Sequence, residues 1–290
     1  MTTKYQSRWQ ALLLLLPSLI ATGVFLYYPA LDAFRLSLYQ TQRGFRGDIY
    51  VGVDNFRTLL TSSGYQSSLF WSFAFAFVVV VGSIGLSILI GFLIHRASAG
   101  SSYYLIAGMI AYGFSFAVAA VVMQFILLPQ HGLLHEITGW SFDWLTNGYL
   151  AFLVICLTTI WKMIGFNLIF IVGALSGIPD TLDDAAKLDG ISGSTMLARV
   201  YLPLIAPTLA FLVVMNTVYA FFLPYPVIDI LTKGSPETTN LLIYELYQTG
   251  IAQGATGEAA AQSIVLFLIV GTLMVIQLLL SERSSYVGGA

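Results

Sequence analysis

Six long apolar runs alternate with polar segments along the chain, and each is close to the roughly 20 residues that cross the hydrocarbon core of a bilayer. The runs cover Ala11–Tyr28, Phe70–Ile94, Tyr103–Leu128, Tyr149–Leu175, Leu204–Tyr225 and Ser263–Leu280. None of them contains an acidic residue. Membrane-spanning β-strands would show shorter segments of alternating polarity instead. The pattern predicts an all-α membrane protein, with six transmembrane helices in a single domain of residues 1–290.

The first run admits two interpretations. Lys4 and Arg8 precede it, as basic residues precede the apolar region of a secretory signal peptide. The run is long for such a region and lacks a clean small-x-small cleavage site. We therefore expect a membrane anchor that remains in the mature protein.

Composition supports the membrane assignment. The chain is 58% apolar and 9% charged, whereas a soluble domain is about half apolar and about a quarter charged. In water such a chain would expose large apolar patches. A net charge of −2 gives no reason to expect a nucleic-acid partner, and the single Cys156 excludes an intrachain disulfide.

Positive charge indicates the orientation only weakly. Six spans place both termini on one side, and if that side is the cytoplasm the inner segments carry six basic residues against five outside. The inner ones are Lys4, Arg8, Arg96, Lys187, Arg199 and Arg283, and the outer ones are Arg35, Arg43, Arg46, Arg57 and Lys233. Four of the outer five lie in one long loop, and long loops count less in the positive-inside rule.

The polar segment between the fourth and fifth runs, residues 178–203, has clear helix signals. Pro179 suits the first turn of a helix, and Thr181 with Asp184 three residues later forms a short capping box. Gly190 permits the backbone conformation at which helices commonly end, and a second short helix can then run towards Pro203. On these signals alone, an ordinary polar loop is an equal alternative to a pair of functional helices.

Spacing within this segment favours the functional alternative. Asp184-Ala185-Ala186 is followed after three residues by Gly190, and after nine more by Val200-Tyr201-Leu202-Pro203. This arrangement resembles the EAA motif of the permease subunits of ATP-binding-cassette (ABC) importers. That motif reads Glu-Ala-Ala, three residues, Gly, nine residues, Ile, any residue, Leu-Pro. Here Asp184 replaces Glu, with the same charge on a shorter arm, and Val200 replaces Ile.

In that family the loop is cytoplasmic and forms coupling helices that dock on an ATPase subunit. The resemblance therefore implies a type I ABC importer permease fold, with residues 178–203 as the coupling-helix loop and both termini in the cytoplasm. The small alanines permit close approach, while Leu182 and Leu188 offer an apolar side. The residues expected to couple to the ATPase are Asp183, Asp184, Ala185, Ala186, Leu188, Asp189, Gly190, Leu202 and Pro203.

Four further segments narrow the resemblance. Val51–Phe56 is similar to a segment of carbohydrate-type (maltose-permease-like) permeases, whereas Val218–Phe222, Pro226–Asp229 and Ala260–Val265 resemble the A subunits of glycerol-3-phosphate and glycerophosphodiester importers. The resemblance implies an inner-membrane permease that forms half of the pathway for a glycerol-phosphate-type or sugar solute. It also implies a second permease, two ATPase subunits that hold ATP and Mg, and an extracytoplasmic binding protein as partners. This chain would itself hold no cofactor and would not be an enzyme.

Lys162 is the clearest candidate for contact with the solute, because an ionisable residue inside a span is costly and usually functional. Its ammonium could hold a phosphate or a sugar hydroxyl, or it could pair with a carboxylate or extend to the membrane surface. In maltose-type relatives the pocket residues flank the EAA loop. The corresponding candidates are Thr159, Trp161, Lys162, Met163, Phe166, Asn216, Tyr219 and Ala220. Asn216 and Tyr219 share a helix face, although hydrogen bonding between helices would explain them equally well.

Other classes of function find less support. An ion-coupled secondary transporter would normally place carboxylates or broken helices at mid-membrane. A membrane enzyme would need a nucleophile–base pair or a metal site. His131 and His135 have a ligand-like spacing beside Glu136, but a solvated loop explains them more simply and no metal is expected. The chain has no P-loop motif, so ATP hydrolysis is expected in a separate subunit.

Overall fold

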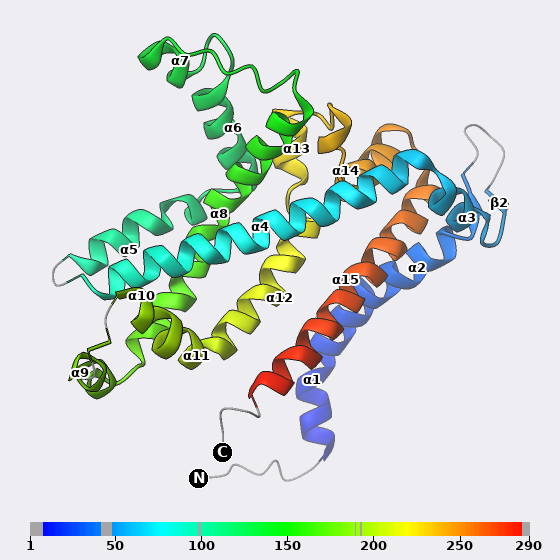
Figure 1. The fold of residues 1–290 in the computed structure, drawn as a ribbon. Coiled ribbons are helices and arrows are strands. Elements are labelled where there is room, and N and C mark those ends of the chain that lie inside the picture. Colours follow the sequence, from blue (N-terminus) through cyan, green and yellow to red (C-terminus); the bar gives the residue numbers. More distant parts are fainter. Residues whose placement is uncertain (1–7, 42–47, 98–99, 189, 192, 286–290) are drawn as a thin grey trace. The chain divides into compact units, whose positions relative to one another are not determined.

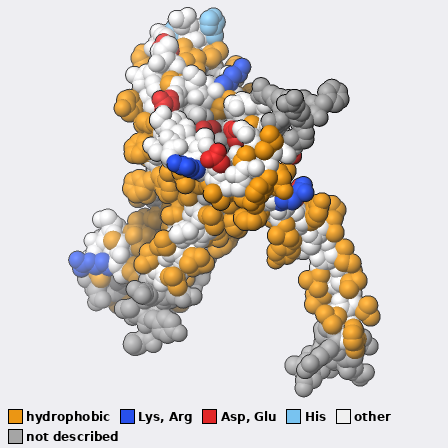
Figure 2. Space-filling view, turned by 90° about the vertical axis from the view of Figure 1, so that its right-hand side faces the viewer, with side chains coloured by type: hydrophobic (Ala, Val, Ile, Leu, Met, Phe, Trp, Pro, Cys, Tyr) orange, Lys and Arg blue, Asp and Glu red, His pale blue; other side chains and the backbone are white. Residues whose placement is uncertain are grey.

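The computed structural model describes residues 8–41, 48–97, 100–188, 190–191 and 193–285. Contacts between these residues group the chain into two compact units. One unit comprises residues 1–62 and 246–267, and the other comprises residues 63–245 and 268–290. Apolar side chains cover much of the surface drawn in Figure 2, with charged groups at only a few places. Such a surface is suited to lipid rather than to water.

The first unit consists mainly of helices near the N-terminus. Its elements are α1 (Arg8–Thr22), η1 (Gly23–Tyr27), α2 (Tyr28–Leu36), β1 (Tyr39–Gln40), β2 (Ile49–Tyr50), α3 (Asp54–Thr61), η5 (Gln248–Ala252) and the first part of α15 (Thr256–Ser285). The candidate span Leu12–Leu36 has no buried residue in its most apolar window. A helix that is apolar on all sides needs lipid or another protein around it.

Asn55 closes the loop that follows the first span. Its Nδ2 donates to the carbonyl oxygens of Ser37 at 2.8 Å and Tyr39 at 2.9 Å. The two short strands beside it form an antiparallel ladder in which Tyr39 pairs with Tyr50. The Val51–Phe56 segment is therefore a structural corner, because its asparagine satisfies backbone groups of the turn.

The second unit contains most of the chain. Its elements are α4 (Ser63–His95), α5 (Ser101–Met109), η2 (Ile110–Gly113), α6 (Phe116–Leu127), α7 (Leu133–Thr138), α8 (Gly148–Ser176), α9 (Asp180–Leu188), α10 (Gly193–Met196), η3 (Leu197–Tyr201), α11 (Leu202–Leu204), α12 (Ala206–Phe222), α13 (Tyr225–Leu231), η4 (Glu237–Thr239), the start of α14 (Leu242–Tyr247) and the rest of α15. The central helix is α8, against which α4, α5 and α12 all pack (Figure 1).

The predicted all-α membrane fold is confirmed. Four described helices are long and apolar enough to cross a membrane, and two bent helix pairs raise the number to as many as six. The four are Leu12–Leu36, Ser63–His95, Gly148–Ser176 and Thr256–Ser281. Most of them extend beyond the apolar runs, because helical hydrogen bonding continues where the sequence becomes polar.

The third predicted run, Tyr103–Leu128, is not one straight helix. Its halves, Ser101–Gly113 and Phe116–Leu127, meet at 101°. The first half ends in a 3-10 turn, and the Ser115 hydroxyl caps the second half by accepting a hydrogen bond from the Val118 amide at 3.2 Å. A glycine followed by a capping serine is a signal for a helix to stop and restart.

The fifth run has a similar break near its beginning. Gly193–Leu204 and Ala206–Phe222 meet at 78°. Pro203 lies near the end of the first half. Pro207 lies in the first turn of α12, where proline is tolerated because its missing amide hydrogen has no intrahelical acceptor. The coupling-helix loop therefore leads directly into a spanning helix through a bend.

Small residues bring α4 and α8 close together. Ser83, Ser87 and Gly91 recur every four residues on α4, a spacing that puts them on one face. A Cβ added to Gly91 would lie 2.9 Å from Cγ2 of Ile171. Such small residues allow membrane helices to approach closely and gain van der Waals contact.

Candidate functional site

A cavity of about 170 Å³ lies midway along α8, next to the break between η2 and α6. Its lining residues are Tyr112, Phe116, Lys162, Met163, Phe166, Tyr219 and Leu223. Four predicted pathway residues, Lys162, Met163, Phe166 and Tyr219, thus surround one space. Tyr112, Phe116 and Leu223 were not among the residues predicted from the sequence.

Gly165 allows the broken span to reach this cavity. A Cβ at this position would lie 2.7 Å from Cβ of Tyr112 and 3.1 Å from Cα of Met109. The absence of a side chain on this face of α8 brings the end of η2 against the turn that carries Lys162. This contact explains why Tyr112 and Phe116 line the cavity although they are distant in sequence from Lys162.

Lys162 stays inside the bundle, and the residue as a whole is only 5% exposed. Its Nζ donates to the carbonyl oxygen of Tyr112 at 3.0 Å and lies 4.7 Å from the ring centre of Tyr112 and 5.1 Å from that of Phe116. The Tyr112 carbonyl is available because carbonyls at the end of a helix lack an intrahelical donor. No carboxylate of a described residue lies within ion-pair distance of the ammonium. The cation is therefore held by a carbonyl and two aromatic rings.

Aromatic rings form most of the remaining wall. The Phe166 ring lies 5.7 Å from the Tyr112 ring and 5.4 Å from the Tyr219 ring, measured between ring centres. Ring faces carry partial negative charge, which stabilises a nearby cation, and they also offer flat apolar surface. The site can bind a group that combines an anion with short carbon chains or sugar faces.

Asn216 does not line the cavity. It is fully buried, and its Nδ2 donates to Oδ1 of Asn167 at 2.8 Å. Its Oδ1 accepts hydrogen bonds from Nδ2 of Asn167 at 3.2 Å and from the Ser83 hydroxyl at 3.0 Å. Of the two roles expected for Asn216, the structure thus shows hydrogen bonding between helices and not a place in the cavity lining.

The remaining pathway candidates also lie outside the cavity lining. The Thr159 hydroxyl is buried and donates to the Ile155 carbonyl of its own helix at 2.8 Å. Ala220 is buried in the packing of α12, and Trp161 is half-buried beside Lys162. Their positions give them no direct contact with this space.

The first half of the coupling-helix loop is exposed. In α9, Leu188 is 89% exposed and Leu182 is 41% exposed, and Asp184 and Ala185 also face outward. Gly190 has a φ of +71°, as a left-handed helix stop requires. Asp189 lies outside the described residues, as do the side chains of Asp183 and Ala186. A short helix with exposed leucines is suited to docking against a partner.

The second half of the same loop is anchored in the protein core. Met196, Tyr201 and Ile205 are buried in one apolar cluster with Phe92 of α4 and Leu175 of α8. Leu202 packs against this cluster, whereas Pro203 is exposed.

The apolar cluster also reaches the cavity. Phe166 belongs to it, and Tyr219 packs against it. Contiguous packing therefore connects the coupling-helix loop with two of the residues that line the cavity.

The His131–His135 pair shows no sign of a metal site. Among the described residues, no group of three or more His, Cys, Asp or Glu side chains is arranged to hold a metal ion. His135 lies in the short helix α7, and His131 precedes it.

Residues 106–284, which include the cavity and the coupling-helix loop, match the family described as binding-protein-dependent transport system inner membrane component. Over 278 residues the chain is 37% identical to the sn-glycerol-3-phosphate transport system permease protein UgpA of Shigella flexneri, with 94% of each chain covered. The proteins of the same name from Escherichia coli O6:K15:H31 (strain 536 / UPEC) and Salmonella choleraesuis (strain SC-B67) are 36% and 35% identical, with the same coverage.

Two solved structures share the fold at 22% sequence identity. One is a bacterial alginate ABC transporter in complex with alginate pentasaccharide-bound periplasmic protein, with a TM-score of 0.82 over 95% of this chain and 94% of that chain. The other is a bacterial ABC transporter involved in the import of the acidic polysaccharide alginate, with a TM-score of 0.81 over 95% and 96%. The chain therefore belongs to the binding-protein-dependent transport system inner membrane component family, as a permease subunit of an ABC importer.

Proposed function

We propose that this chain forms half of the translocation pathway for a solute that carries a phosphate ester, such as glycerol 3-phosphate. The observation that carries the proposal is Lys162, a buried ammonium that faces a cavity and has no carboxylate partner among the described residues. An uncompensated charge in apolar surroundings is costly, and an anion that enters the cavity relieves that cost. The relatives at 35–37% identity are permeases of sn-glycerol-3-phosphate transport systems, which supports the same class of solute.

A di- or oligosaccharide is the second candidate, and the aromatic wall favours it. Phe166 and Tyr219 offer ring faces against which a sugar ring can stack. A neutral sugar, however, needs stacking and hydrogen bonds and makes no use of a fixed positive charge. The contribution of the Lys162 charge to uptake therefore distinguishes the two solutes.

We further propose the partners that such a permease requires. The exposed α9 docks on one of two ATPase subunits, because its leucines have no cover within the described chain and the sequence contains no P-loop. A second homologous permease forms the other half of the pathway, and an extracytoplasmic binding protein delivers the solute. In this arrangement α9 and both chain termini lie in the cytoplasm.

Uptake measurements on Lys162 variants test the solute. We expect Lys162→Met to reduce uptake of glycerol 3-phosphate by roughly tenfold or more, since a hydrogen bond to a charged group is involved. Lys162→Arg should retain part of the uptake, because it keeps the charge and a donor for the Tyr112 carbonyl. Leu157→Met, at an exposed position of α8 outside the cavity lining, is the matched control. All variants are compared in the complete complex, with glycerophosphocholine and maltose alongside and with membrane levels measured.

The uptake of each solute by the Lys162 variants distinguishes a phosphate ester from a saccharide as the transported solute. Unchanged phosphate-ester uptake in Lys162→Met, at normal membrane levels, would remove the ammonium from solute recognition. Maltose uptake that persists in Lys162→Met, with no phosphate-ester uptake in any variant, would favour the saccharide.

Copurification tests the docking of the ATPase. Leu188→Glu should lower the amount of ATPase subunit that purifies with the permease, because it places a charge on the exposed side of α9. Ile137→Glu is the matched control, since Ile137 is 74% exposed on the short helix α7. Equal recovery of the ATPase with both variants would exclude Leu188 from the docking surface.

A further inference from the structure

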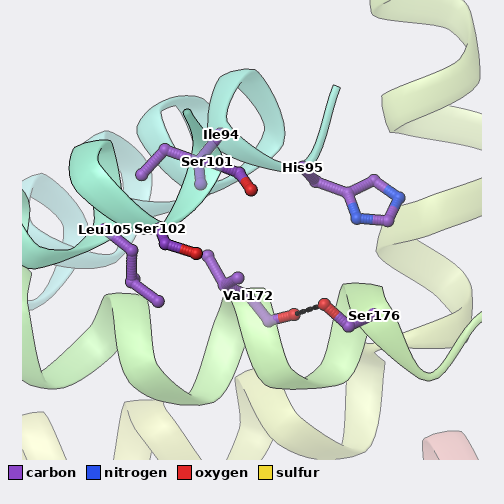
Figure 3. A pocket seen from close by; sticks show the side chains of 7 residues that line it. All are labelled: Ile94, His95, Ser101, Ser102, Leu105, Val172 and Ser176. Carbon is purple, nitrogen blue, oxygen red and sulfur yellow. Dashed lines mark hydrogen bonds between the residues drawn. The ribbon is translucent and has the colours of Figure 1, made fainter. Parts of the chain in front are cut away.

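Two adjacent cavities lie at one end of the second unit, and both are lined by Ile94. The first, of about 260 Å³, contains the polar side chains of His95, Ser101, Ser102 and Ser176 (Figure 3). Ser176 is 14 residues after Lys162 on α8, or about 21 Å along the helix axis at the usual rise per residue. These cavities are therefore separate from the candidate solute site.

The second cavity, of about 400 Å³, has a different lining. Its walls come from Ile90 and Leu93 of α4, from Ala97 shortly after the end of that helix, and from Tyr104 and Gly108 of α5. Only the Tyr104 hydroxyl interrupts this apolar lining. A long hydrocarbon chain would fit these surroundings, whereas a soluble anion would not.

Both cavities lie where spanning helices end. His95 is the last residue of α4, and Ser176 is the last residue of α8. Tyr103 and Tyr104, in the first turn of α5, are 79% and 59% exposed. Exposed aromatic residues beside the ends of spans are typical of the level of lipid headgroups.

Polar hydrogen-bonding side chains line the first cavity, and a basic residue, Arg96, follows His95 in the chain. Figure 3 shows Ser101 and Ser102 on α5 opposite Val172 and Ser176 on α8, with His95 to one side of them. Arg96 follows His95 and is exposed, with its guanidinium 5.6 Å from the ring centre of Phe92. No acidic residue is among the described side chains that line either cavity.

We propose that the paired cavities hold one anionic phospholipid. Its headgroup occupies the polar cavity near His95 and Arg96, and an acyl chain occupies the apolar cavity, with Ile94 between the two parts. An amphiphile is required because the two linings differ in polarity while sharing a residue. The His95 ring lies 5.6 Å from the ring of Tyr201, so the headgroup would be next to the anchored half of the coupling-helix loop.

Native mass spectrometry of the purified complex, titrated with phosphatidylglycerol or phosphatidylcholine, tests this proposal. We expect phosphatidylglycerol to be retained preferentially, and Arg96→Gln to weaken its retention about fivefold, as the loss of one basic group near an anionic headgroup predicts. Ala97→Phe, which fills the apolar cavity, should weaken retention of both lipids. Arg57→Gln is the control, since it removes an exposed arginine from α3 in the other unit.

Three results would overturn the proposal. One is equal retention of the two lipids by the unmodified complex. Another is the same loss of phosphatidylglycerol in Arg57→Gln as in Arg96→Gln, which would indicate a general charge effect. The third is displacement of phosphatidylglycerol by soluble glycerol 3-phosphate, which would indicate a site for a free phosphate ester. If Ala97→Phe fails to fold, the comparison of Arg96→Gln with Arg57→Gln still tests whether the anionic phospholipid binds at this site.

Discussion

Asn216 on α12 and Asn167 on α8 exchange two side-chain hydrogen bonds, at 2.8 and 3.2 Å. The Ser83 hydroxyl of α4 donates to the same Asn216 oxygen at 3.0 Å, so three helices meet at one polar point. None of the three side chains has exposed surface. Because lipid provides no hydrophobic force between helices, such bonds help to determine which helices associate and in which register.

Removal of one asparagine should therefore destabilise the bundle. Hydrogen bonds between membrane helices average about 0.6 kcal/mol and reach about 1.7 kcal/mol. We expect Asn216→Leu to lower the free energy of unfolding by about 1–2 kcal/mol, because Asn167 and Ser83 lose a buried partner. Unfolding in detergent of Asn216→Leu, Asn167→Leu and the double variant would measure their coupling. Strictly additive effects would show that the two asparagines do not act as a pair.

Gly165 is the position at which a small change should alter the cavity most. Gly165→Val places atoms where Tyr112 and Met109 already lie, so η2 must move away from α8. Overpacking of this kind costs about 1–3 kcal/mol, and the hydrogen bond from Lys162 to Tyr112 should break. We expect a lower melting temperature and reduced uptake. Gly173→Val on the same helix has nothing within 4 Å of its added Cβ and should be tolerated; similar behaviour of the two variants would contradict the prediction.

Gly190 should be essential for coupling rather than for folding. Proline cannot adopt its φ of +71°, so Gly190→Pro should disrupt the turn after α9 and abolish solute-stimulated ATP hydrolysis. Gly190→Ala should keep part of the activity, because a left-handed residue costs about 1–2 kcal/mol. Gly139→Pro provides the control, since Gly139 has a φ of +69° and an equally open environment. Equal losses at both glycines would point to general instability.

Glu245, outside the candidate spans, should make stability depend on pH. Burial raises the pKa of its carboxyl group, and a hydrogen bond with Ser68 opposes this only partly. A raised folded-state pKa means that the folded protein favours the protonated carboxyl group of Glu245. The contribution of this group to the stability of the folded state is therefore lost as pH rises through that pKa. Glu245→Gln should therefore melt at a higher temperature than the unmodified protein at pH 8, with the difference shrinking as pH falls.

The exposed Glu237 supplies the matched control for this measurement. Glu237→Gln should leave the melting temperature almost unchanged across the same pH range, because its side chain remains in solvent. A lower melting temperature for Glu245→Gln at pH 8 would show that the ionised carboxylate stabilises the fold.

Hydropathy predicted the spanning helices well because a span must be apolar along its length, whatever its neighbours are. The same uniform hydropathy concealed the break after Gly113. Gly113 and Ser115 were visible as stop and cap signals, but neither changes the apolar character of the run. The angle between the two halves depends on packing against α8, which periodicity does not describe.

The candidate site was predictable only where it lies on the helices that flank the coupling-helix loop. Lys162, Met163, Phe166 and Tyr219 line the cavity. Lys162 was predicted because it is an ionisable residue inside an apolar run, and the other three were placed by resemblance. Tyr112 contributes its backbone carbonyl. Because every residue has one, the residue type at this position gives no sign of the contact. The sequence left open whether Asn216 lines the pocket or bonds to another helix. Its partner Asn167 lies 49 positions away on α8, and the way α8 packs against α12 cannot be read from the sequence of either helix alone.

The Tyr112 carbonyl also has a kinetic consequence. An anion that enters the cavity would share the ammonium of Lys162 with the neutral Tyr112 carbonyl oxygen, which lies 3.0 Å from Nζ in this structure. A permanent competitor weakens the bound state, and a transport site works only if its ligand leaves as readily as it arrives. If the cavity holds the solute as proposed, the broken span would supply an acceptor to which the ammonium returns when the solute departs, and this would shorten the residence time of the solute.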